Sequence, residues 1–418
     1  MIFDFDGTLV DTAPLIISTM QAAIRELRLP SKSDSECRAT IGLRLEEIPG
    51  VLWSDRPGLS QEYARTYRRI FDELKRPLNV RCFPGVIDTL KHLHDMGYRL
   101  AVASSRSNKS LVEYAETFGI TELLDAIVGG NDVKNGKPAP DAVLSICGRL
   151  DWEMSETLVV GDATFDIEMG RNAGAMTCGV TYGNQSRSEI ASAHPDVILD
   201  SFPGLIPVLR GVEPETVNYV ELSVIPRYAE FDKAHREDHV RMVIGQSLKL
   251  AERLPELDVN MVYVIAAFHD LGLVNGRERH HLDSGKILAA DEFVRSHFST
   301  SRIAILVEAV EDHRASNCSK PRSDYGMIVA EADRFIDAET ILRRTVQYGL
   351  ANYPELDMEG HYRRTLEHLI AKYGPDGYLK VWIPWSDNAA RLVQLHKLIA
   401  DRDSLRKAFN RIYSEEIS

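Results

Sequence analysis

The pattern of hydrophobic residues changes once along the chain, near residue 205, and this change limits the folds that the chain can adopt. Before it, short apolar runs rich in β-branched residues alternate with helical stretches. The runs are MIFDF at the start, RLAVASS from residue 99, AIVGG from 126, TLVVGD from 157 and TCGVTYG from 177. Strands that alternate with helices indicate a parallel sheet covered by helices on both faces. We therefore predict a doubly wound α/β fold for this part of the chain.

Two stretches depart from this alternation and are helical in pattern. Between the first two predicted strands, residues 13–84 lack strand signals, and LIISTMQAAIREL and YARTYRRIFDEL carry apolar residues at three-to-four spacing. We predict that this insert folds as a small helical cap. After residue 226 the periodic segments have the apolar stripe of a helix, as in NMVYVIAAFHDLG and SRIAILVEAVEDH. This last part is predicted to be all-helical.

A boundary lies between the two patterns, where prolines and glycines between residues 201 and 226 interrupt any long element. We predict a Rossmann-like α/β domain over residues 1–205, with the cap inserted at about 13–84. A linker over 206–226 and an all-α domain over 227–418 complete the predicted organisation. A length of 418 residues agrees with two domains.

The composition argues against several classes of protein. The formal net charge of −13 does not suit a protein that binds nucleic acid or an anionic membrane, because both need a basic face. Five scattered cysteines without a CxxC pair indicate neither a disulfide framework nor a thiolate zinc site. The sequence carries no signal-peptide pattern and no membrane-spanning stretch. We expect a cytoplasmic protein.

Polar residues follow the predicted strands of the α/β domain. The first strand ends in Asp4-Phe5-Asp6, and the alternation of side chains along a strand sends both carboxylates to the same side. The carboxyl ends of parallel strands form one edge of a sheet, where such folds bind their ligands. An Asp-Gly pair alone is more often a turn than a site. Later segments, however, bring further polar groups to the same edge, namely Ser104, Ser105, Arg106, Lys137, Asp162 and Asp166.

The segments that carry these residues resemble the four successive motifs of the haloacid dehalogenase-like phosphatases. They read DFDGTLVDT, VASS, NGKPAPD and GDATFDIEMGRNAGA, in that order over roughly 200 residues. The resemblance implies that Asp4 is the nucleophile that takes the phosphoryl group. It implies that Asp6 protonates the leaving oxygen and later activates water. Ser104 would donate a hydrogen bond to the phosphoryl oxygens, and Lys137 would offset the charge of Asp4 and the phosphate.

The same resemblance implies a magnesium ion. Asp4, the backbone carbonyl of Asp6 and Asp162 would hold it, and Asp166 would support these ligands. A cation at this place makes physical sense, because an aspartate and a phosphate repel each other at the distance that attack requires.

The motif wording and the position of the helical insert resemble the phosphoglycolate phosphatase and sugar-phosphate phosphatase branch. In that branch the cap closes over the active site and contributes substrate contacts. Arg44, in the segment IGLRL, and Ser105 are the residues that we expect to contact the substrate. Arg44 could equally be a solvated helix charge. The resemblance implies that the partners are small phosphorylated metabolites, and the motifs do not exclude a mutase that returns the phosphoryl group to a sugar.

Histidines cluster in the second half of the chain. A lone histidine at a helix end is usually an ordinary exposed or satisfied side chain. Imidazole and carboxylate together, however, suit divalent first-row metals, and a His-Asp doublet at the end of an apolar helix costs stability unless something binds it. The set consists of His239, His269, Asp270, His281, His313 and Asp333.

The order H…HD…H…H…D resembles the HD superfamily of metal-dependent phosphohydrolases. The resemblance implies that His239, His269, Asp270 and Asp333 form a core quartet, and that His281 and His313 are the extra ligands of members with a second metal. Asp270 would bridge two ions, and a metal-bound hydroxide would attack a phosphoester. One or two ions of manganese, iron, cobalt, nickel or zinc are expected. The residues most easily confused with these ligands are His235 and His280.

The second half departs from many HD relatives in one respect. They follow the doublet with Gly-Lys, whereas this chain has Leu271-Gly272-Leu273, so the charge for a substrate phosphate must come from another residue. The candidates are Arg277, Arg279, Arg314 and Arg334. We expect a bifunctional metal-dependent hydrolase. The alternatives are a phosphatase fused to a di-iron oxygenase and a phosphatase regulated by a ligand-sensing HD module. The sequence leaves a homodimer open.

Overall fold

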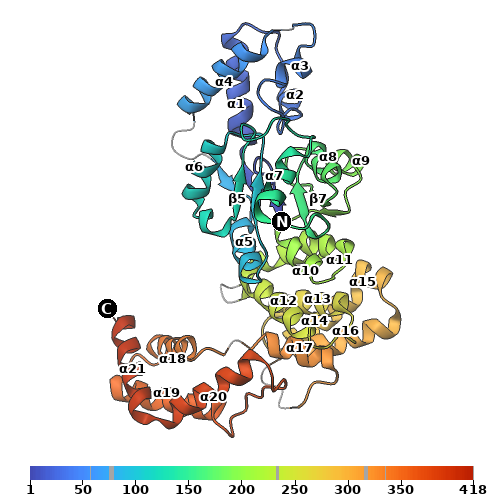
Figure 1. The fold of residues 1–418 in the computed structure, drawn as a ribbon. Coiled ribbons are helices and arrows are strands. Elements are labelled where there is room, and N and C mark those ends of the chain that lie inside the picture. The colour runs from blue at the N-terminus through green and yellow to red at the C-terminus, as the bar shows by residue number, and fades with distance from the viewer. Residues whose placement is uncertain (57, 75–79, 232–234, 315–318, 335, 418) are drawn as a thin grey trace. The chain divides into compact units, whose positions relative to one another are not determined.

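The computed structural model describes residues 1–56, 58–74, 80–231, 235–314, 319–334 and 336–417. The chain forms two compact units, residues 1–209 and residues 210–418. The first unit contains a parallel sheet and the second is helical, as the sequence predicts (Figure 1).

The first unit is built on a six-stranded parallel sheet with the strand order β5-β4-β1-β6-β7-β8. Neighbouring strands pair in register, with Ile2 opposite Ala101 on one side and opposite Val159 on the other. The chain runs outward from β1 through β4 to β5 and then returns to the far side of β1, so the order reverses at β1, where open sheets bind ligands. The strands are β1 (Ile2–Phe3), β4 (Ala101–Ala103), β5 (Ala126–Val128), β6 (Leu158–Gly161), β7 (Met176–Val180) and β8 (Val197–Leu199).

Both faces of the sheet are covered. Alternate side chains of a strand point to opposite faces. Ile2 packs on one face in a cluster with Val143 and Ile146, and Phe3 packs on the other against Phe202, with ring centroids 5.5 Å apart. The covering helices are α5 (Val86–Asp95), α6 (Asn108–Phe118), α7 (Asp141–Leu150), α8 (Thr164–Ala173), α9 (Arg187–Ser192) and α10 (Leu205–Leu209).

The cap is helical, with a core of its own around Met20, Trp53 and Tyr63. Its longest helix buries Tyr63, Tyr67 and Phe71 at helical spacing. A short antiparallel pair, β2 (Val10–Asp11) and β3 (Arg81–Cys82), joins the cap to the sheet unit. This pair and β8 were not predicted from the sequence. The cap helices are α1 (Ala13–Glu26), α2 (Asp34–Arg38), α3 (Ile48–Leu52) and α4 (Ser60–Leu74).

Two groups of helices form the second unit, and its described residues contain no strand. In the first group α13 is buried on all sides from Met261 to Phe268, which explains its uninterrupted apolar sequence. The helices of this group are α11 (Pro214–Tyr219), α12 (Glu237–Ala251), α13 (Val259–Phe268), α14 (His280–Ala290), α15 (Glu292–His297), α16 (Thr300–Asp312) and α17 (Asp324–Ala332). The second group packs around Phe409 and Leu369. It consists of α18 (Ala338–Asn352), α19 (Met358–Tyr373), α20 (Asp387–Ala400) and α21 (Arg402–Ile417).

The segment 206–226 is folded rather than extended. It contains the end of α10, α11, and a π-helical turn at Val220–Val224 that continues into a 3₁₀ turn at Ile225–Glu230. The prolines that suggested a linker start two of these short elements, because the first turn of a helix tolerates proline.

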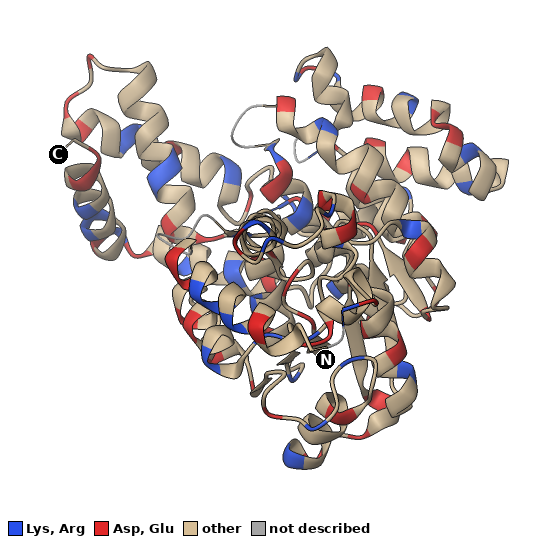
Figure 2. Cartoon of the chain, turned by 90° about the horizontal axis from the view of Figure 1, so that it is seen from above, with Lys and Arg blue, Asp and Glu red and all other residues tan. Residues whose placement is uncertain are grey.

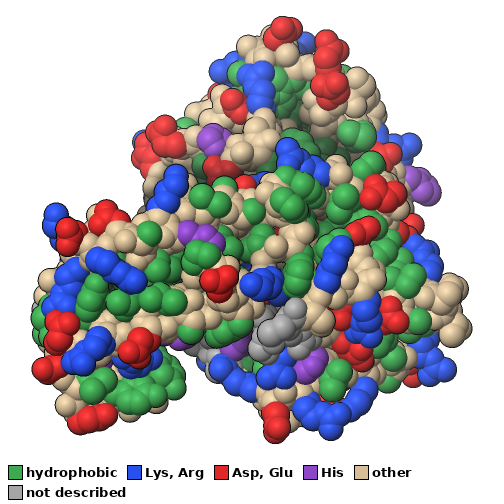
Figure 3. Space-filling view, turned by 90° about the horizontal axis from the view of Figure 1, so that it is seen from below, with side chains coloured by type: hydrophobic (Ala, Val, Ile, Leu, Met, Phe, Trp, Pro, Cys, Tyr) green, Lys and Arg blue, Asp and Glu red, His purple; other side chains and the backbone are tan. Residues whose placement is uncertain are grey.

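Basic and acidic residues alternate along the ribbon in Figure 2, and their side chains are interspersed on the face shown in Figure 3. Among the described residues, none of the helices combines the length and the apolar character that a membrane span requires.

Candidate active sites

Three aspartates meet at the point where the strand order reverses. Asp4 follows β1, Asp162 follows the neighbouring strand β6, and Asp166 lies in the first turn of α8. One carboxylate oxygen from each lies within 4.8 Å of the others, and all three side chains are buried. This cluster is a candidate metal site built only from oxygen donors.

Lys137 is the cation that faces this cluster. Its ammonium forms buried ion pairs with Asp4 and, at 2.5 Å, with Asp166. Burial opposes its charged form, but Asp166 and Asp4 outweigh burial and raise the pKa of Lys137. A single lysine cannot neutralise three carboxylates. The donors therefore fit a hard divalent cation.

Burial also dominates the acidity of the carboxylates. Burial raises the pKa of Asp4 well above its usual range although Lys137 opposes the shift. Burial, together with the charge of Asp166, raises the pKa of Asp162 to about 7. Without a further cation, ionising both Asp4 and Asp162 is energetically costly.

Asp162 is held by groups that the sequence analysis did not select. The hydroxyl of Thr8 donates to Asp162 Oδ1 at 3.0 Å, and the backbone N–H of Asn184 donates to Oδ2 at 2.6 Å. Gly7 has φ of +99°, and a Cβ there would lie 2.2 Å from Asp162 Oδ2, so glycine is required. The Asn184 amide also donates to the carbonyl of Asp6 at 3.1 Å. The sequence could have indicated Asn184, because it lies just after β7 and therefore near the same edge of the sheet as Asp4 and Asp162.

Asp6 forms an ion pair with Arg106. Arg106 Nε donates to Asp6 Oδ2 at 3.1 Å, and the Thr12 hydroxyl donates to Oδ1 at 2.7 Å. The guanidinium is buried, and its carbon lies 5.1 Å and 5.2 Å from the ring centroids of Phe71 and Tyr114. The sequence placed Arg106 at the right sheet edge but assigned it no role, because its partner lies 100 residues away.

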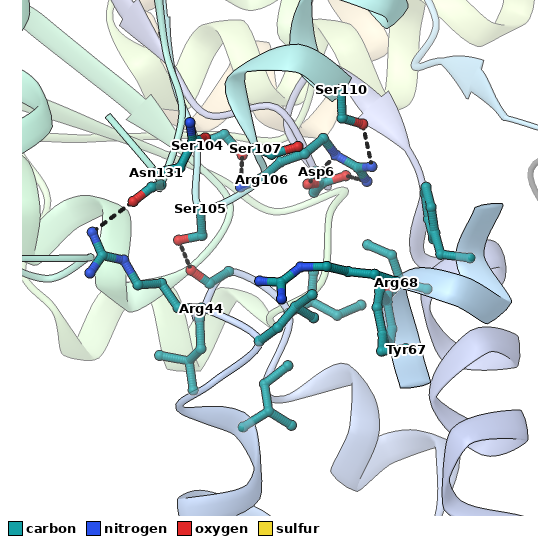
Figure 4. Close-up of a pocket in the computed structure, with 18 of the residues that line it drawn as sticks. Asp6, Arg44, Tyr67, Arg68, Ser104, Ser105, Arg106, Ser107, Ser110 and Asn131 are labelled. Carbon is teal, nitrogen blue, oxygen red and sulfur yellow. Dashed lines mark hydrogen bonds and ion pairs between the residues drawn. The ribbon is translucent and has the colours of Figure 1, made fainter. Parts of the chain in front are cut away.

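A cavity of about 470 Å³ lies between these groups and the cap (Figure 4). Asp4, Asp6 and Ser104 line it from the sheet side. Ser104 is buried, and its hydroxyl oxygen accepts a hydrogen bond from the backbone N–H of Arg106 at 3.3 Å. Asp4, Asp6 and Ser104, the predicted nucleophile, acid–base residue and hydroxyl donor, therefore line the same cavity.

The two predicted substrate contacts, Arg44 and Ser105, line this cavity but already have protein partners. The Arg44 guanidinium donates to the carbonyls of Gly130, Val133 and Lys134, each at 2.8 Å. The Ser105 hydroxyl donates to the carbonyl of Gly42 at 2.5 Å. Arg44 is therefore not a solvated helix charge. Both residues connect the cap to the loops at the sheet edge.

A second cluster lies where helices of the second unit begin and end. His239 lies in the first turn of α12, His269 and Asp270 follow α13, His280 begins α14, and His313 follows α16. Asp333 follows α17, and its carboxylate lies 3.2 Å from His239 Nε2 and 3.8 Å from His269 Nε2. The helix ends thus bring together residues that are far apart in sequence.

The two oxygens of Asp270 face different histidines. Oδ2 lies 3.6 Å from His239 Nε2 and 3.4 Å from His269 Nε2. Oδ1 lies 3.5 Å from His280 Nε2 and 3.4 Å from His313 Nε2. Two groups of metal-ligand atoms therefore share one carboxylate, which suits a pair of ions.

The ring orientations also fit metal binding. The Nδ1 atoms of His269, His280 and His313 each lie 2.5–2.8 Å from the carbonyl three residues earlier. An N–H at Nδ1 leaves a lone pair on Nε2. The Nε2 atoms of His280 and His313 are 3.2 Å apart, and those of His269 and His239 are 3.4 Å apart. Converging lone pairs repel unless a proton or a metal lies between them.

At one position the structure brings a neighbouring histidine, rather than the predicted one, to the cluster. His280, not His281, directs its Nε2 at Asp270 and His313, and His281 belongs to neither group of ligand atoms. His235 also lies outside both groups. The remaining predicted residues, His239, His269, Asp270, His313 and Asp333, come together as described above.

Comparison with known proteins matches each unit separately. Residues 1–180 match the family model of haloacid dehalogenase-like hydrolases, and residues 236–337 match that of the HD domain. The probable phosphatase IndB of Dickeya dadantii is 36% identical over 209 residues, which are 49% of this chain and 91% of that protein. The phosphoglycolate phosphatase of Salmonella typhimurium is 31% identical over 228 residues, 50% of this chain and 90% of that protein. A solved structure of a predicted phosphoglycolate phosphatase from Haemophilus somnus covers 50% of this chain and 96% of its own, with 27% identity and a TM-score of 0.45.

Proposed function

We propose that this chain, which belongs to the haloacid dehalogenase-like hydrolases and continues into an HD domain, is a bifunctional hydrolase with one metal-dependent site in each half. The phosphatase half acts on small phosphomonoesters. The observation that carries this half of the proposal is the buried group of Asp4, Asp162 and Asp166 around Lys137, beside a cavity that admits a ligand.

In the proposed reaction, Asp4 attacks phosphorus and the bond to the leaving oxygen breaks. Asp6, oriented by Thr12 and protonated from solvent when its ion pair with Arg106 opens, gives the leaving oxygen that proton and then takes one from the water that hydrolyses the aspartyl phosphate. Ser104 donates to the phosphoryl oxygens, and Lys137 holds Asp4 in place. Magnesium, held by Asp4, Asp162 and the carbonyl of Asp6 with Asp166 beside them, would supply the positive charge that lets two anions approach.

The cavity favours a leaving group with apolar surface. The basic residues of the cap that line it are occupied, since Arg68 pairs with Glu46 at 2.5 Å and Arg44 binds carbonyls. A carboxylate such as that of glycolate would need a free cation in the cap, because Lys109, on the opposite wall, is exposed and lies 4.0 Å from Glu113. The cap instead offers apolar side chains, namely Ile16, Met20, Ile41, Leu45, Tyr67 and Phe71. We infer that the substrate is a larger and less charged monoester than phosphoglycolate.

We expect phenyl phosphate and hexyl phosphate to have a kcat/KM about tenfold or more above that of phosphoglycolate. Burying an apolar group of this size contributes about 1.5–3 kcal/mol. Leu45→Asp should remove this preference by placing a carboxylate in the cavity, whereas Leu144→Asp, at an exposed position on α7, should leave it unchanged. A preference for phosphoglycolate in the unmodified protein would contradict the assignment.

In the second half, we propose that the two groups of ligand atoms around Asp270 hold two transition-metal ions and that the half hydrolyses a phosphoester. His239, His269 and Asp333 would hold one ion, and His280 and His313 the other. The ions, when bound, supply water activation and positive charge. Support comes from the pairing of each Asp270 oxygen with its own set of histidines. The alternative, a di-iron oxygenase, would require iron and show oxygen-dependent turnover.

Adjacent histidines provide a test of the ligand set. We expect His280→Ala to lower the metal content by about one ion per chain, because His280 and His313 form one of the two groups. His281→Ala should leave the metal content unchanged. Elemental analysis of both purified variants measures the difference. If His281→Ala loses an ion while His280→Ala keeps both, the assignment of His280 is wrong.

A further inference from the structure

A second cavity in the helical unit is separate from the metal-ligand cluster. Its volume is about 320 Å³, and residues of α12, the end of α17 and the first turn of α20 line it. None of the six clustered residues described above is part of its lining. Its basic residues are Lys249, Arg253, Arg334 and Arg391.

Arg334 is the buried member of this group, with 5% of its surface exposed. Its Nη1 donates to the carbonyl of Ala330, in the last turn of α17, and its Nε is buried without a partner. Among the described residues, no carboxylate forms a salt bridge with Arg334, although Glu331 and Asp333 lie close enough to interact with its charge. A carbonyl at a helix end offers only a partial negative charge. A buried guanidinium with so little compensation is costly, unless an anion binds there.

The acidic groups around the cavity have other partners. Lys249 pairs with Asp387 at 2.8 Å, and Glu252 pairs with Arg210 at 2.6 Å. Glu331 is fully buried and accepts hydrogen bonds from Ser386 Oγ, at 2.5 Å, and from the backbone N–H of Trp382, at 3.3 Å.

Arg253 lies 5.0 Å from the ring centroid of Trp385, a side chain that also lines the cavity. The cavity thus presents two arginines, Arg253 and Arg334, that have no described carboxylate in ion-pair contact.

We propose that this cavity binds the phosphate group of a small metabolite through Arg334, with Arg253 as a second contact. A guanidinium matches the geometry of a phosphate, and two of them can bind different oxygens. The cavity begins one turn along α12 from His239, because Met242 and Gln246 lie on the same helix face. Gln246 is roughly 10 Å from His239 along the helix axis. A bound phosphate would therefore lie beside the metal cluster without being part of it.

The test is a calorimetric titration. Inorganic phosphate is added to the metal-free full-length chain at constant ionic strength, and the heat of binding is measured. Without magnesium the carboxylates of Asp4, Asp162 and Asp166 repel phosphate, which weakens binding at the first site. We expect Arg334→Met to weaken the binding at least tenfold. It should also unfold at the same or a higher temperature than the parent protein without phosphate, because it removes a buried charge. Arg406→Met, which breaks an exposed ion pair with Glu359, should bind phosphate normally.

Two outcomes would overturn the proposal. One is equal phosphate binding by the parent protein and Arg334→Met, or no binding by either. The other is that Arg334→Met melts at a lower temperature and still binds phosphate, which would make Arg334 only a cap of α17. If Arg334→Met does not fold, phosphate binding by Arg253→Gln provides the test. Arg253 is exposed, so its replacement should leave the fold intact and still weaken phosphate binding several-fold.

Discussion

Asp4→Asn is expected to lower phosphatase turnover roughly a thousandfold or more while the protein stays folded. The amide has nearly the shape of the carboxylate but is a poor nucleophile, and loss of a nucleophile in a concerted site costs factors of this size. The fold should tolerate the change, because burial and the neighbouring Asp166 and Asp162 already disfavour the charge of Asp4. Lys137 keeps its ion pair with Asp166 at 2.5 Å.

Steady-state hydrolysis of phenyl phosphate with magnesium, together with thermal unfolding, measures both parts of this expectation. Asp11→Asn is the matched control. Asp11 is an exposed aspartate at the end of β2, and its replacement should change neither rate nor stability. If Asp4→Asn keeps more than a few per cent of the parent turnover, Asp4 is not the nucleophile.

The sheet was largely predictable because its strands are buried on both faces. β1, β4, β5, β6 and β7 coincide with the predicted apolar runs. Strand β8 (Val197–Leu199), which pairs with β7, was not predicted, although it is as long as β4 and β5; its apolar run lies alone between Asp196 and Asp200. The pair β2 and β3 depends on contacts between Val10 and Cys82, which local patterns do not reveal.

The positions of candidate site residues were predictable where the strand that carries a residue determines where its side chain lies. Asp4 and Asp162 end neighbouring strands, so the sheet brings them together. The sequence failed where the position depends on tertiary contacts. Arg106 pairs with a residue 100 positions away. His280 and His281 differ by one residue at the start of α14, a rotation of about 100° around the helix, and only the packing of that helix decides which ring faces Asp270.

Replacing both His269 and Asp270 by alanine is expected to abolish transition-metal binding and to spare the phosphatase. The double variant removes the carboxylate shared by both groups of ligand atoms and one histidine that faces it. Imidazole donors favour manganese, iron, cobalt, nickel or zinc, whereas the aspartates of the first half favour magnesium. Because the two clusters share no residue, magnesium-dependent turnover should remain within about twofold of the parent value.

Metal analysis and a phosphatase assay on the same purified sample separate the competing interpretations. The control variant, His235→Ala with Asp238→Ala, removes one histidine and one aspartate near the cluster but outside its ligand groups, and it should retain the metal. Full transition-metal content in the His269 and Asp270 variant would contradict the assignment of these two residues as metal ligands. Loss of phosphatase activity in a folded, metal-free variant would instead show that the helical half controls the first site. That outcome would favour a regulatory HD module over a second hydrolase, because loss of metal from an independent enzyme should not change the activity of the other site.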